Sequence, residues 1–273
     1  MQKTSNAADL AALSKSMRRR VIEMITAAKS GHPGGSLSAV EILVTLFFDV
    51  MRHDPSNPKW KDRDRFLLSK GHACPILYAV MAECGYCPTD QLNTLRKLGS
   101  MYQGHPDVRF LASLEASTGS LGQGLSLAIG MGLAAKLDRS PARAYVVLGD
   151  GESQEGQIWE AAMFAGFRKV DNVVAIVDYN RIQLDGFVKD ILDLEPLADK
   201  WRNFGWHAIE VDGHDIAALQ KAFAEAAATK GQPTVLIAHT IKGKGVSFME
   251  NNPKYHGQAP TLDEEARALA ELA

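Results

Sequence analysis

Apolar residues follow two kinds of pattern along this chain, and their order predicts the fold. Five short runs are almost continuously apolar, as in strands buried on both faces of a parallel sheet: residues 66–69, 144–149, 172–178, 206–211 and 234–239. Longer segments repeat apolar residues every three or four positions, as helices do: 7–28, 38–50, 75–84, 89–98, 125–137, 155–168, 215–229 and a C-terminal tail, 262–272. We predict a single α/β domain, residues 1–273, in which helices cover both faces of a parallel sheet.

Composition narrows the class of protein without naming a function. The 273 residues are 46% hydrophobic and 23% charged, with a formal net charge of −2. Charge this close to neutral argues against a nucleic-acid or membrane-surface protein. The sequence shows neither an apolar run of membrane-spanning length nor the apolar core of a signal peptide, and an odd number of cysteines fits a reducing compartment. We therefore expect a cytoplasmic protein.

Cys84 and Cys87 form a lone CxxC sequence. This spacing occurs in redox and metal sites, but the chain has no second pair. Gly85 and Pro88 are typical of a helix end followed by a turn. We therefore favour a structural role for both cysteines.

Two predicted strands end in residues that can bind a metal ion. Gly149-Asp150-Gly151 closes one strand, and Asn180 follows the next strand along the chain. Parallel strands present their carboxyl ends at one edge of the sheet, where ligands of such folds bind. Mg²⁺ prefers oxygen ligands and is commonly completed by phosphates of a substrate or cofactor. The pattern favours a site for Mg²⁺ and a diphosphate; the alternative is a plain strand-to-helix turn with Asp150 as a cap.

A glycine-rich segment before the helix at 125–137 invites a different interpretation. Its order is Gly119-x-x-Gly122-x-Gly124, whereas the dinucleotide fingerprint is GxGxxG. No strand clearly precedes it. We reject a Rossmann-type cofactor site.

Four histidines lie in loops bounded by glycine: His32, His72, His105 and His256. A single loop histidine is usually only solvated. Four of them beside a diphosphate site indicate more, because imidazole can donate to phosphate and sugar oxygens and can transfer protons near neutral pH.

The motifs SGHPGG, DRFLLSKGHA, GHPD, TGSLGQG, GDGESQEG and DYNRIQLDG occur in the order and spacing of the transketolase family. From about residue 7 to residue 260 the chain resembles the family's N-terminal, thiamine-diphosphate-binding domain, known as the PP-type domain. TIKGKG at 240–245, followed by His256-Gly257, resembles the N-terminal subunit of split transketolases. The ordered set of motifs is specific, although each motif alone is not.

The resemblance implies a role for each matching residue. The Mg²⁺ ligands would be the side chains of Asp150 and Asn180 and the backbone carbonyl of Ile182, with Ca²⁺ or Mn²⁺ as substitutes. Cofactor contacts would come from His72, Gly119, Leu121, Gly149, Asp150, Gly151, Glu152, Asn180, Ile182 and His256. His32, His105 and His256 would line the substrate channel. Glu155 and Glu160 would join an acidic network between paired active sites, although acids in a first helical turn are also favoured by the helix dipole alone.

The implied reaction is covalent catalysis by thiamine diphosphate, in which a two-carbon ketol unit passes from a ketose phosphate to an aldose. Two departures matter. Ser120 stands where longer enzymes commonly have proline, and residues 1–273 contain no pyrimidine-binding domain, which carries the glutamate that activates the cofactor. The resemblance therefore implies a C-terminal partner subunit, with an α₂β₂ assembly expected.

Other functions remain open at this point. A deoxyxylulose-phosphate synthase-like subunit or a 2-oxo acid dehydrogenase-like subunit would share the GDG…N site, but the four histidines favour transketolase. A non-catalytic cofactor-binding module is the alternative of another class. The sugar substrates also stay open: pentose phosphates are the default, and branched or sulfonated sugars are a further possibility.

Overall fold

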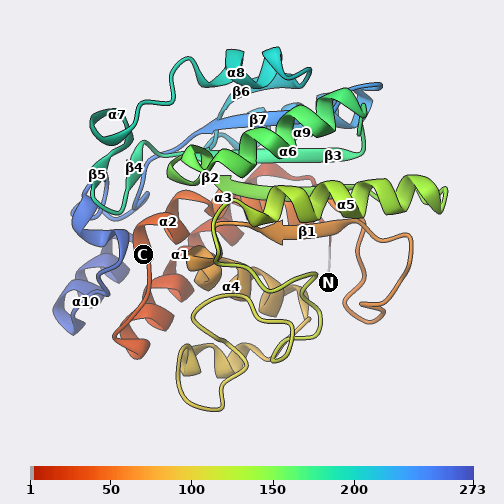
Figure 1. The fold of residues 1–273 in the computed structure, drawn as a ribbon. Helices are drawn as coiled ribbons and strands as arrows, with labels where there is room; N and C mark the ends of the chain where they lie inside the picture. Colours follow the sequence, from red (N-terminus) through yellow and green to blue (C-terminus); the bar gives the residue numbers. More distant parts are fainter. Residues whose placement is uncertain (1–2) are drawn as a thin grey trace.

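The computed structural model of the chain describes residues 3–273 and is built around a five-stranded parallel sheet (Figure 1). The strands lie in the order β1-β2-β3-β7-β6. Their bounds are β1 (Arg65–Leu68), β2 (Ala144–Gly149), β3 (Val173–Tyr179), β6 (His207–Asp212) and β7 (Thr234–His239). The predicted sheet is thus confirmed, with β2 and β7 at their predicted bounds and the other three shifted by one residue.

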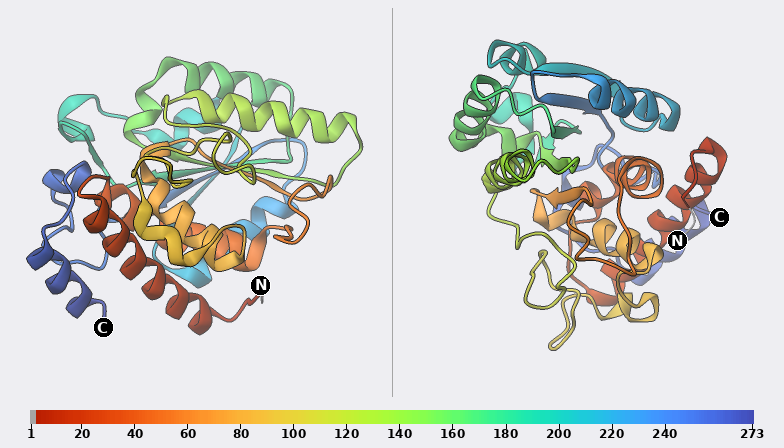
Figure 2. Two further views of the ribbon diagram at one scale, coloured as in Figure 1. Left: turned by 90° about the horizontal axis from the view of Figure 1, so that it is seen from below. Right: turned by 90° about the vertical axis from the view of Figure 1, so that its right-hand side faces the viewer.

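Helices cover both faces of this sheet, and alternate strand residues supply the two cores. On β3, Val174 and Ile176 face one core, whereas Val173, Ala175 and Val177 face the other. The first core is covered by α1 (Ala7–Ala28), α3 (Val40–Thr45), α4 (Cys74–Cys84) and α9 (Ile216–Ala228). The second is covered by α5 (Gln123–Leu137), α6 (Gly156–Phe167) and α8 (Leu197–Asn203). Figure 2 shows the red and orange helices and the green helices on opposite sides of the strands.

Two predicted helices differ from the structure. The segment predicted as a helix at 38–50 begins earlier, at α2 (Pro33–Ser38), bends at Ala39 and ends in a π-helical turn (Leu46–Val50). The predicted helix at 89–98 is only a 3₁₀ segment (Thr89–Thr94), after which Leu95 leaves the helical conformation and Arg96 is left-handed. Short polar side chains that compete for backbone hydrogen bonds explain why no α-helix forms there.

Several short elements were not predicted. They include the hairpin of β4 (Ile182–Gln183) and β5 (Gly186–Phe187), the helices α7 (Val188–Ile191) and α8, and 3₁₀ segments at Gly71–Ala73, Gly151–Gln154 and Pro253–His256. The predicted C-terminal helix is present as α10 (Leu262–Glu271).

Two negative expectations can be compared with residues 3–273. No helix there combines the length and apolar character needed to cross a membrane. Cys84 ends α4, Gly85 caps it in a left-handed conformation, and the thiols of Cys84 and Cys87 are free. The helix end and turn predicted at this CxxC sequence are confirmed, and the structural role of the two cysteines stays a prediction.

Candidate active site

The carboxyl ends of β2 and β3 bring Asp150 and Asn180 to one edge of the sheet. Gly149 on β2 pairs with Asp178 on β3, so the residues that follow leave the sheet together. One carboxylate oxygen of Asp150 accepts a hydrogen bond from the Gly151 N–H at 2.7 Å, and the other accepts one from the Arg181 N–H. The Asp150 carboxylate therefore lies against the backbone that directly follows Asn180.

The oxygen atoms at this position fit a small, hard cation. Asn180 Oδ1 accepts a hydrogen bond from the Ile182 N–H at 3.1 Å, which fixes its amide beside the Ile182 backbone. Burial, together with the nearby charge of Asp178, raises the pKa of Asp150 to about 6. A bound cation would therefore stabilise the ionised form of this carboxylate. A carboxylate, an amide oxygen and a carbonyl oxygen are ligands that Mg²⁺ prefers.

The remaining ligands would have to come from outside the chain. Within residues 3–273, no group of three or more His, Cys, Asp or Glu side chains is arranged to hold a metal ion. A cation at Asp150 would therefore depend on one carboxylate, neutral oxygens and further donors such as phosphate. This donor set matches a metal that binds together with a diphosphate.

A buried ion pair between Lys70 and Asp178 lies directly behind this position. Lys70 Nζ also donates to the Gly35 carbonyl at 2.8 Å, and the Asp178 carboxylate accepts from Ser38, Thr240 and Asn180 as well. Burial alone would raise the pKa of Asp178, but the Lys70 charge and these hydrogen bonds lower it. Asp178 is therefore ionised, and its hydrogen bond with Asn180 orients the amide of that residue.

A second buried lysine, Lys242, contacts both the predicted metal site and a predicted catalytic histidine. Its Nζ donates to the Ile182 carbonyl at 2.6 Å and lies 2.8 Å from His256 Nδ1. Burial lowers the pKa of Lys242 to about 8. As an ammonium group it can only donate, so His256 Nδ1 accepts and the proton of this imidazole resides on Nε2.

Three of the four predicted histidines form one group at this edge of the sheet: His32, His72 and His256. Their ring centroids lie 5.1, 5.7 and 5.4 Å apart. Burial is the main reason that the pKa falls to about 4 for His32, to about 3 for His256 and well below the ordinary value for His72. At neutral pH this histidine group is uncharged, and each ring offers one donor and one acceptor nitrogen.

His105 lies beside this group, against the predicted aminopyrimidine contact Gly119. Gly119 has φ 131°, and a Cβ there would lie 2.7 Å from the His105 ring. A Cβ on Gly71, next to His72, would lie 2.7 Å from the Gly119 nitrogen. Both close approaches require glycine, and they pack the loops of His72, His105 and Gly119 against one another.

Glu152 is predicted to contact the cofactor, and its carboxylate is hydrogen-bonded to three loops of the site. One carboxylate oxygen accepts from the Gly122 N–H at 2.8 Å and from Ser69 Oγ, and the other accepts from the Gly149 N–H at 2.9 Å. Burial raises its pKa. Through these hydrogen bonds Glu152 joins the loops after β1, before α5 and after β2, and its contact with the cofactor stays a prediction.

The other predicted residues surround the same position. Gly151 packs against the β4–β5 hairpin, since a Cβ there would lie 2.9 Å from Gln183 Cβ. The Leu121 carbonyl accepts from Gln157 Nε2 at 3.1 Å, which ties the start of α5 to α6. Glu155 occupies the N-cap position of α6 without a capping hydrogen bond from its side chain, and Glu160 lies about one and a half turns further, on the exposed face of that helix.

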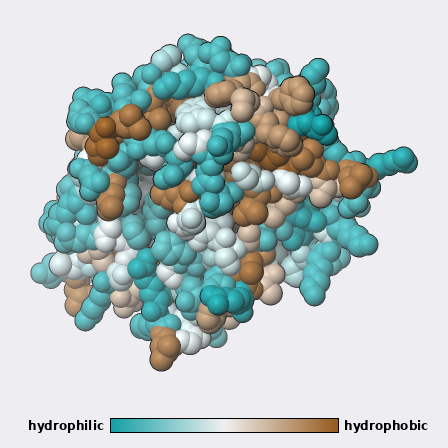
Figure 3. Space-filling model, in the orientation of Figure 1, coloured by the Kyte–Doolittle hydropathy of each residue, from teal (hydrophilic) through white to brown (hydrophobic). Residues whose placement is uncertain are grey.

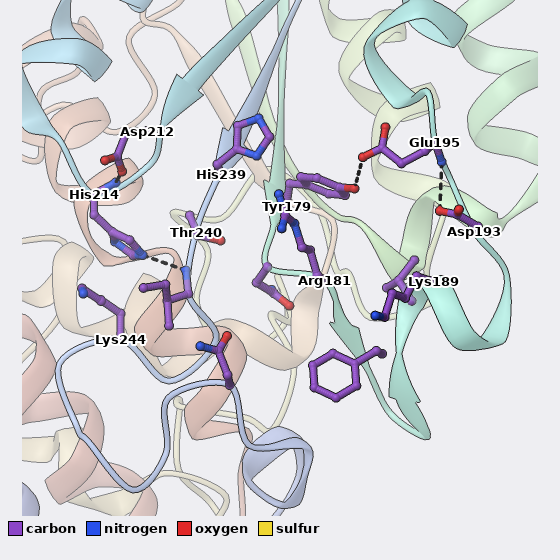
Figure 4. A pocket seen from close by; sticks show the side chains of 15 residues that line it. Tyr179, Arg181, Lys189, Asp193, Glu195, Asp212, His214, His239, Thr240 and Lys244 are labelled. Carbon is purple, nitrogen blue, oxygen red and sulfur yellow. Dashed lines mark hydrogen bonds between the residues drawn. The ribbon is translucent and has the colours of Figure 1, made fainter.

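A cavity of about 1020 Å³ opens next to Asn180, on the β7 and β6 side of the sheet (Figure 4). Tyr179, Arg181, His214 and Lys244 are among the side chains around it. The Ile241 N–H donates to His214 Nε2 at 2.8 Å, which holds the segment that leads to Lys242. The cavity lining includes none of the histidine group, so it is distinct from the space at those rings.

Sequence reasoning missed the three buried charges of the site. Lys70 and Lys242 lie within motifs that were recognised, and Asp178 belongs to a predicted strand, but no role was assigned to any of them. Charged residues inside an otherwise apolar strand or directly after one were the available signal, because such residues are rarely buried without a partner.

Fold and site together define a class of protein: a parallel α/β domain that presents buried oxygen atoms and a group of neutral histidines at the carboxyl ends of its strands. The family described as "Transketolase, thiamine diphosphate binding domain" matches residues 11–272. The chain belongs to the transketolase family and corresponds to its thiamine-diphosphate-binding domain.

Two relatives match the chain over nearly their whole length. It is 47% identical over 256 residues to the 6-deoxy-6-sulfo-D-fructose transketolase subunit SqwG of Clostridium sp. (strain MSTE9), covering 94% of the chain and 93% of that protein. It is 41% identical over 260 residues to an apulose-4-phosphate transketolase subunit from Phocaeicola vulgatus, covering 95% and 92%. The chain is thus a transketolase subunit.

In longer members of the family, one part of the protein corresponds to this chain. Rat transketolase (Rattus norvegicus) is 47% identical over 247 residues, which span 89% of this chain but 38% of that protein. The crystal structure of transketolase from Campylobacter jejuni superimposes with a TM-score of 0.93 at 32% identity, covering 98% of this chain and 43% of that one. The chain therefore spans about two fifths of the length of these relatives.

Proposed function

We propose that this chain is the N-terminal subunit of a two-chain transketolase that binds Mg²⁺ and the diphosphate of thiamine diphosphate. With a C-terminal partner it would transfer a two-carbon ketol unit from a ketose phosphate to an aldose. The observation that carries this proposal is the convergence of Asp150, Asn180 and the histidine group at one edge of the sheet.

The cofactor would be held by residues of the loops that follow β1, β2, β3 and β7. Asp150, Asn180 and the Ile182 carbonyl would ligate the metal, while His72, Gly151 and His256 would contact the diphosphate, with Lys242 nearby to balance its charge. The Gly119 carbonyl and Leu121 would meet the rest of the cofactor. When bound, thiamine diphosphate supplies a nucleophilic carbon that carries the two-carbon unit.

The histidines would do their work as neutral groups. An uncharged imidazole can donate a hydrogen bond to a sugar hydroxyl. Because it carries no charge, it does not attract the phosphate group of the substrate. It can also take up a proton transiently as the sugar hydroxyl loses one, and then return it. We assign this role to His32, His105 and His256, and we assign Glu155 and Glu160 to an acidic link toward a second active site.

The partner would cover an apolar surface on α5 and α6. Leu127, Leu137, Met163, Phe164 and Phe167 are all exposed there; we call this set the partner face. Figure 3 shows apolar side chains gathered over these two helices. Exposed apolar patches of this kind mark protein–protein contacts. Because α6 starts next to the Asp150 loop, a pyrimidine-binding subunit docked here would close the cofactor site, and we propose an α₂β₂ assembly.

The named relatives suggest where to look for the substrate. One acts on 6-deoxy-6-sulfo-D-fructose and another on apulose 4-phosphate. We propose a sulfonated or branched sugar as the second candidate donor class, beside the pentose phosphates. We further propose a cytoplasmic location, which agrees with free thiols at Cys74, Cys84 and Cys87.

The test is turnover by this chain with thiamine diphosphate and Mg²⁺, alone and mixed with a C-terminal transketolase subunit. Donors would be xylulose 5-phosphate, 6-deoxy-6-sulfo-D-fructose and apulose 4-phosphate, with ribose 5-phosphate and glyceraldehyde 3-phosphate as acceptors. We expect activity only in the mixture, and loss of metal-dependent cofactor binding of about 100-fold or more in Asp150→Ala, because a charged ligand is removed. Asp263→Ala, on exposed α10, is the control. Undiminished cofactor affinity in Asp150→Ala would refute the metal assignment.

A further inference from the structure

Arg96 contacts the segments on which two predicted catalytic histidines lie. Its Nη1 donates to Ser30 Oγ at 2.9 Å, and its Nη2 donates to the Gly104 carbonyl at 3.3 Å. The same Nη2 lies 3.5 Å from His32 Nδ1. Ser30 precedes His32 by two residues and Gly104 directly precedes His105. One guanidinium group therefore bridges two segments that are more than 60 residues apart in the chain.

The backbone holds this guanidinium in place. Arg96 has φ 61°, a left-handed conformation that is uncommon for residues other than glycine. Its N–H donates to the Tyr102 carbonyl at 2.8 Å, which closes the turn between the 3₁₀ segment and the loop of His105. A conformation that costs free energy and is locked by a closed turn is typical of functional sites.

The contact with His32 selects one tautomer of that ring. A guanidinium group has only donors, so the nitrogen facing it must be unprotonated. The proton of His32 then resides on Nε2. A Cβ on Gly257 would lie 3.7 Å from that Nε2, so the protonated nitrogen is directed toward the loop of His256. The tautomer directs the donor of His32 into the space shared by the histidine group.

The contact with Gly104 controls the position of His105. A Cβ on Gly104 would lie 3.0 Å from Nε and 3.1 Å from Cζ of Arg96, so the guanidinium packs directly on this backbone. The Gly104 carbonyl is the acceptor that fixes the peptide leading into His105. Moving Arg96 would therefore move the His105 ring relative to Gly119.

We propose that Arg96 is a positioning residue, which sets the tautomer of His32 and the placement of His105 for proton transfer and sugar binding. The proposal rests on the proposed function, because that function gives the two histidines their role. Burial is the largest cause of the lowered pKa of His32, and the Arg96 charge is the next. The other groups that face His32 are His72, His105, His256 and Lys242.

The first measurement is the protonation state of the histidines in the full chain, by ¹⁵N NMR of histidine-labelled protein. In the wild type we expect His32 to carry its proton on Nε2 and to stay neutral down to pH 5. In Arg96→Ala we expect mixed tautomers and a pKa that rises from about 4 toward the ordinary value. Arg96→Lys keeps the charge but loses the two-pronged geometry, so it should keep the pKa low without restoring the Ser30 and Gly104 contacts.

The second measurement is turnover by the assembled enzyme. Arg96→Ala should lower kcat/KM by about 100-fold, as for other misplaced catalytic groups, while the affinity for thiamine diphosphate changes less than about twofold. The acid limb of the pH profile should move to higher pH. Lys97→Ala, at the exposed neighbouring position, is the control. Circular dichroism would verify folding, and Ser30→Ala offers a milder variant of the same bridge.

The outcomes separate this proposal from the function on which it rests. An unchanged His32 tautomer and pKa in Arg96→Ala would overturn it, even if turnover fell. If the wild-type complex turned over no candidate sugar, the proposed function would fail, whereas the NMR measurement would still show whether Arg96 sets the state of His32.

Discussion

Burial outweighs the ordinary basicity of imidazole at His32, His72 and His256. Each ring is close to the other two and to the lysines of the site, so protonation would place a further positive charge among existing ones. The rings therefore serve as hydrogen-bonding groups near neutral pH. Beside the proposed diphosphate site, a group of neutral donors could bind the hydroxyl groups of a sugar.

This arrangement makes stability depend on pH in a defined window. The unfolded chain binds protons at its histidines near pH 6.5, but folded His32 and His256 resist protonation until about pH 4 and 3. The unfolded state therefore binds more protons in that window, and the free energy of unfolding should fall as pH decreases from about 6.5 to 4. Urea denaturation at a series of pH values would measure it.

Removing one of these rings should flatten the dependence. In His32→Gln we expect the slope of unfolding free energy against pH to decrease, by at most about 1.4 kcal/mol per pH unit, because one proton no longer distinguishes the two states. Partial exposure of His32 reduces the effect below that limit. Identical slopes in wild type and variant would contradict the assignment of a neutral His32.

At the scale of residues, the sequence predicted the ends of strands better than the charges behind them. Asp150 and Asn180 were recognisable because each follows an apolar strand. Lys70 and Lys242 were not, because their partners Gly35 and Ile182 are brought close only by the fold. The role of Arg96 was missed for a further reason. Arg96 lay in the helix predicted at 89–98, where a charged side chain is expected to point into solvent.

Helix α6 illustrates how closely elements approach one another in this fold. Gly166 packs on the backbone that follows α8, where a Cβ would lie 1.7 Å from the Phe204 carbonyl oxygen. Trp206 Nε1 also donates to the Ala162 carbonyl of the same helix at 2.8 Å. The backbone of α6 thus lies directly on the connection between α8 and β6, which fixes the direction of a helix that begins at the predicted active site.

Gly166→Ala should destabilise the chain by about 2 kcal/mol or more, because neither backbone can withdraw from a clash of this size without repacking. Gly130→Ala is the matched control: it lies within α5 and a Cβ there meets nothing within 4 Å. We expect that variant to be neutral or more stable by up to about 1 kcal/mol, since alanine favours helix. Thermal and urea unfolding would compare the two. Equal effects would contradict the packing argument.

At the scale of elements, the predicted bounds of helices and strands were correct where a single pattern of apolar residues continued without interruption. α1 has its predicted bounds, as do β2 and β7. The β4–β5 hairpin and α7 were missed because each is only one turn or two residues per strand, too short for a period to show. They nevertheless carry the Ile182 carbonyl, which was located through the family resemblance and not through any pattern of apolar residues.

At the scale of the whole molecule, α5 and α6 carry an apolar surface that the other described elements leave uncovered. The helices on the opposite side of the sheet enclose a core to which α10 also contributes, whereas α5 and α6 bury one side and expose the partner face. Phe167 is 80% exposed and Met163 is 56% exposed. The relatives matched over nearly their whole length are named as subunits, and the partner face is the surface that we propose for a second chain.

Phe167→Glu should weaken association with the C-terminal subunit by about 100-fold, because a charge would be buried in an apolar contact. The same change should alter the stability of the isolated chain by less than about 0.5 kcal/mol, as for other exposed positions. Leu262→Glu is the control, because Leu262 is 75% exposed on α10. Association would be measured by calorimetry or analytical ultracentrifugation. Unaltered affinity in Phe167→Glu would place the partner elsewhere.

The Glu152 carboxylate has a consequence for how such chains evolve. It accepts hydrogen bonds from Ser69, Gly122 and Gly149, and a Cβ on Gly124 would lie 2.4 Å from Ser69 Cβ. A larger side chain at one of these glycines, or loss of the Glu152 carboxylate, would disturb the other members of the set. Positions 69, 122, 124 and 152 should therefore vary jointly or not at all among homologues. Sequence variation among homologues should accumulate instead at positions that do not contact this set.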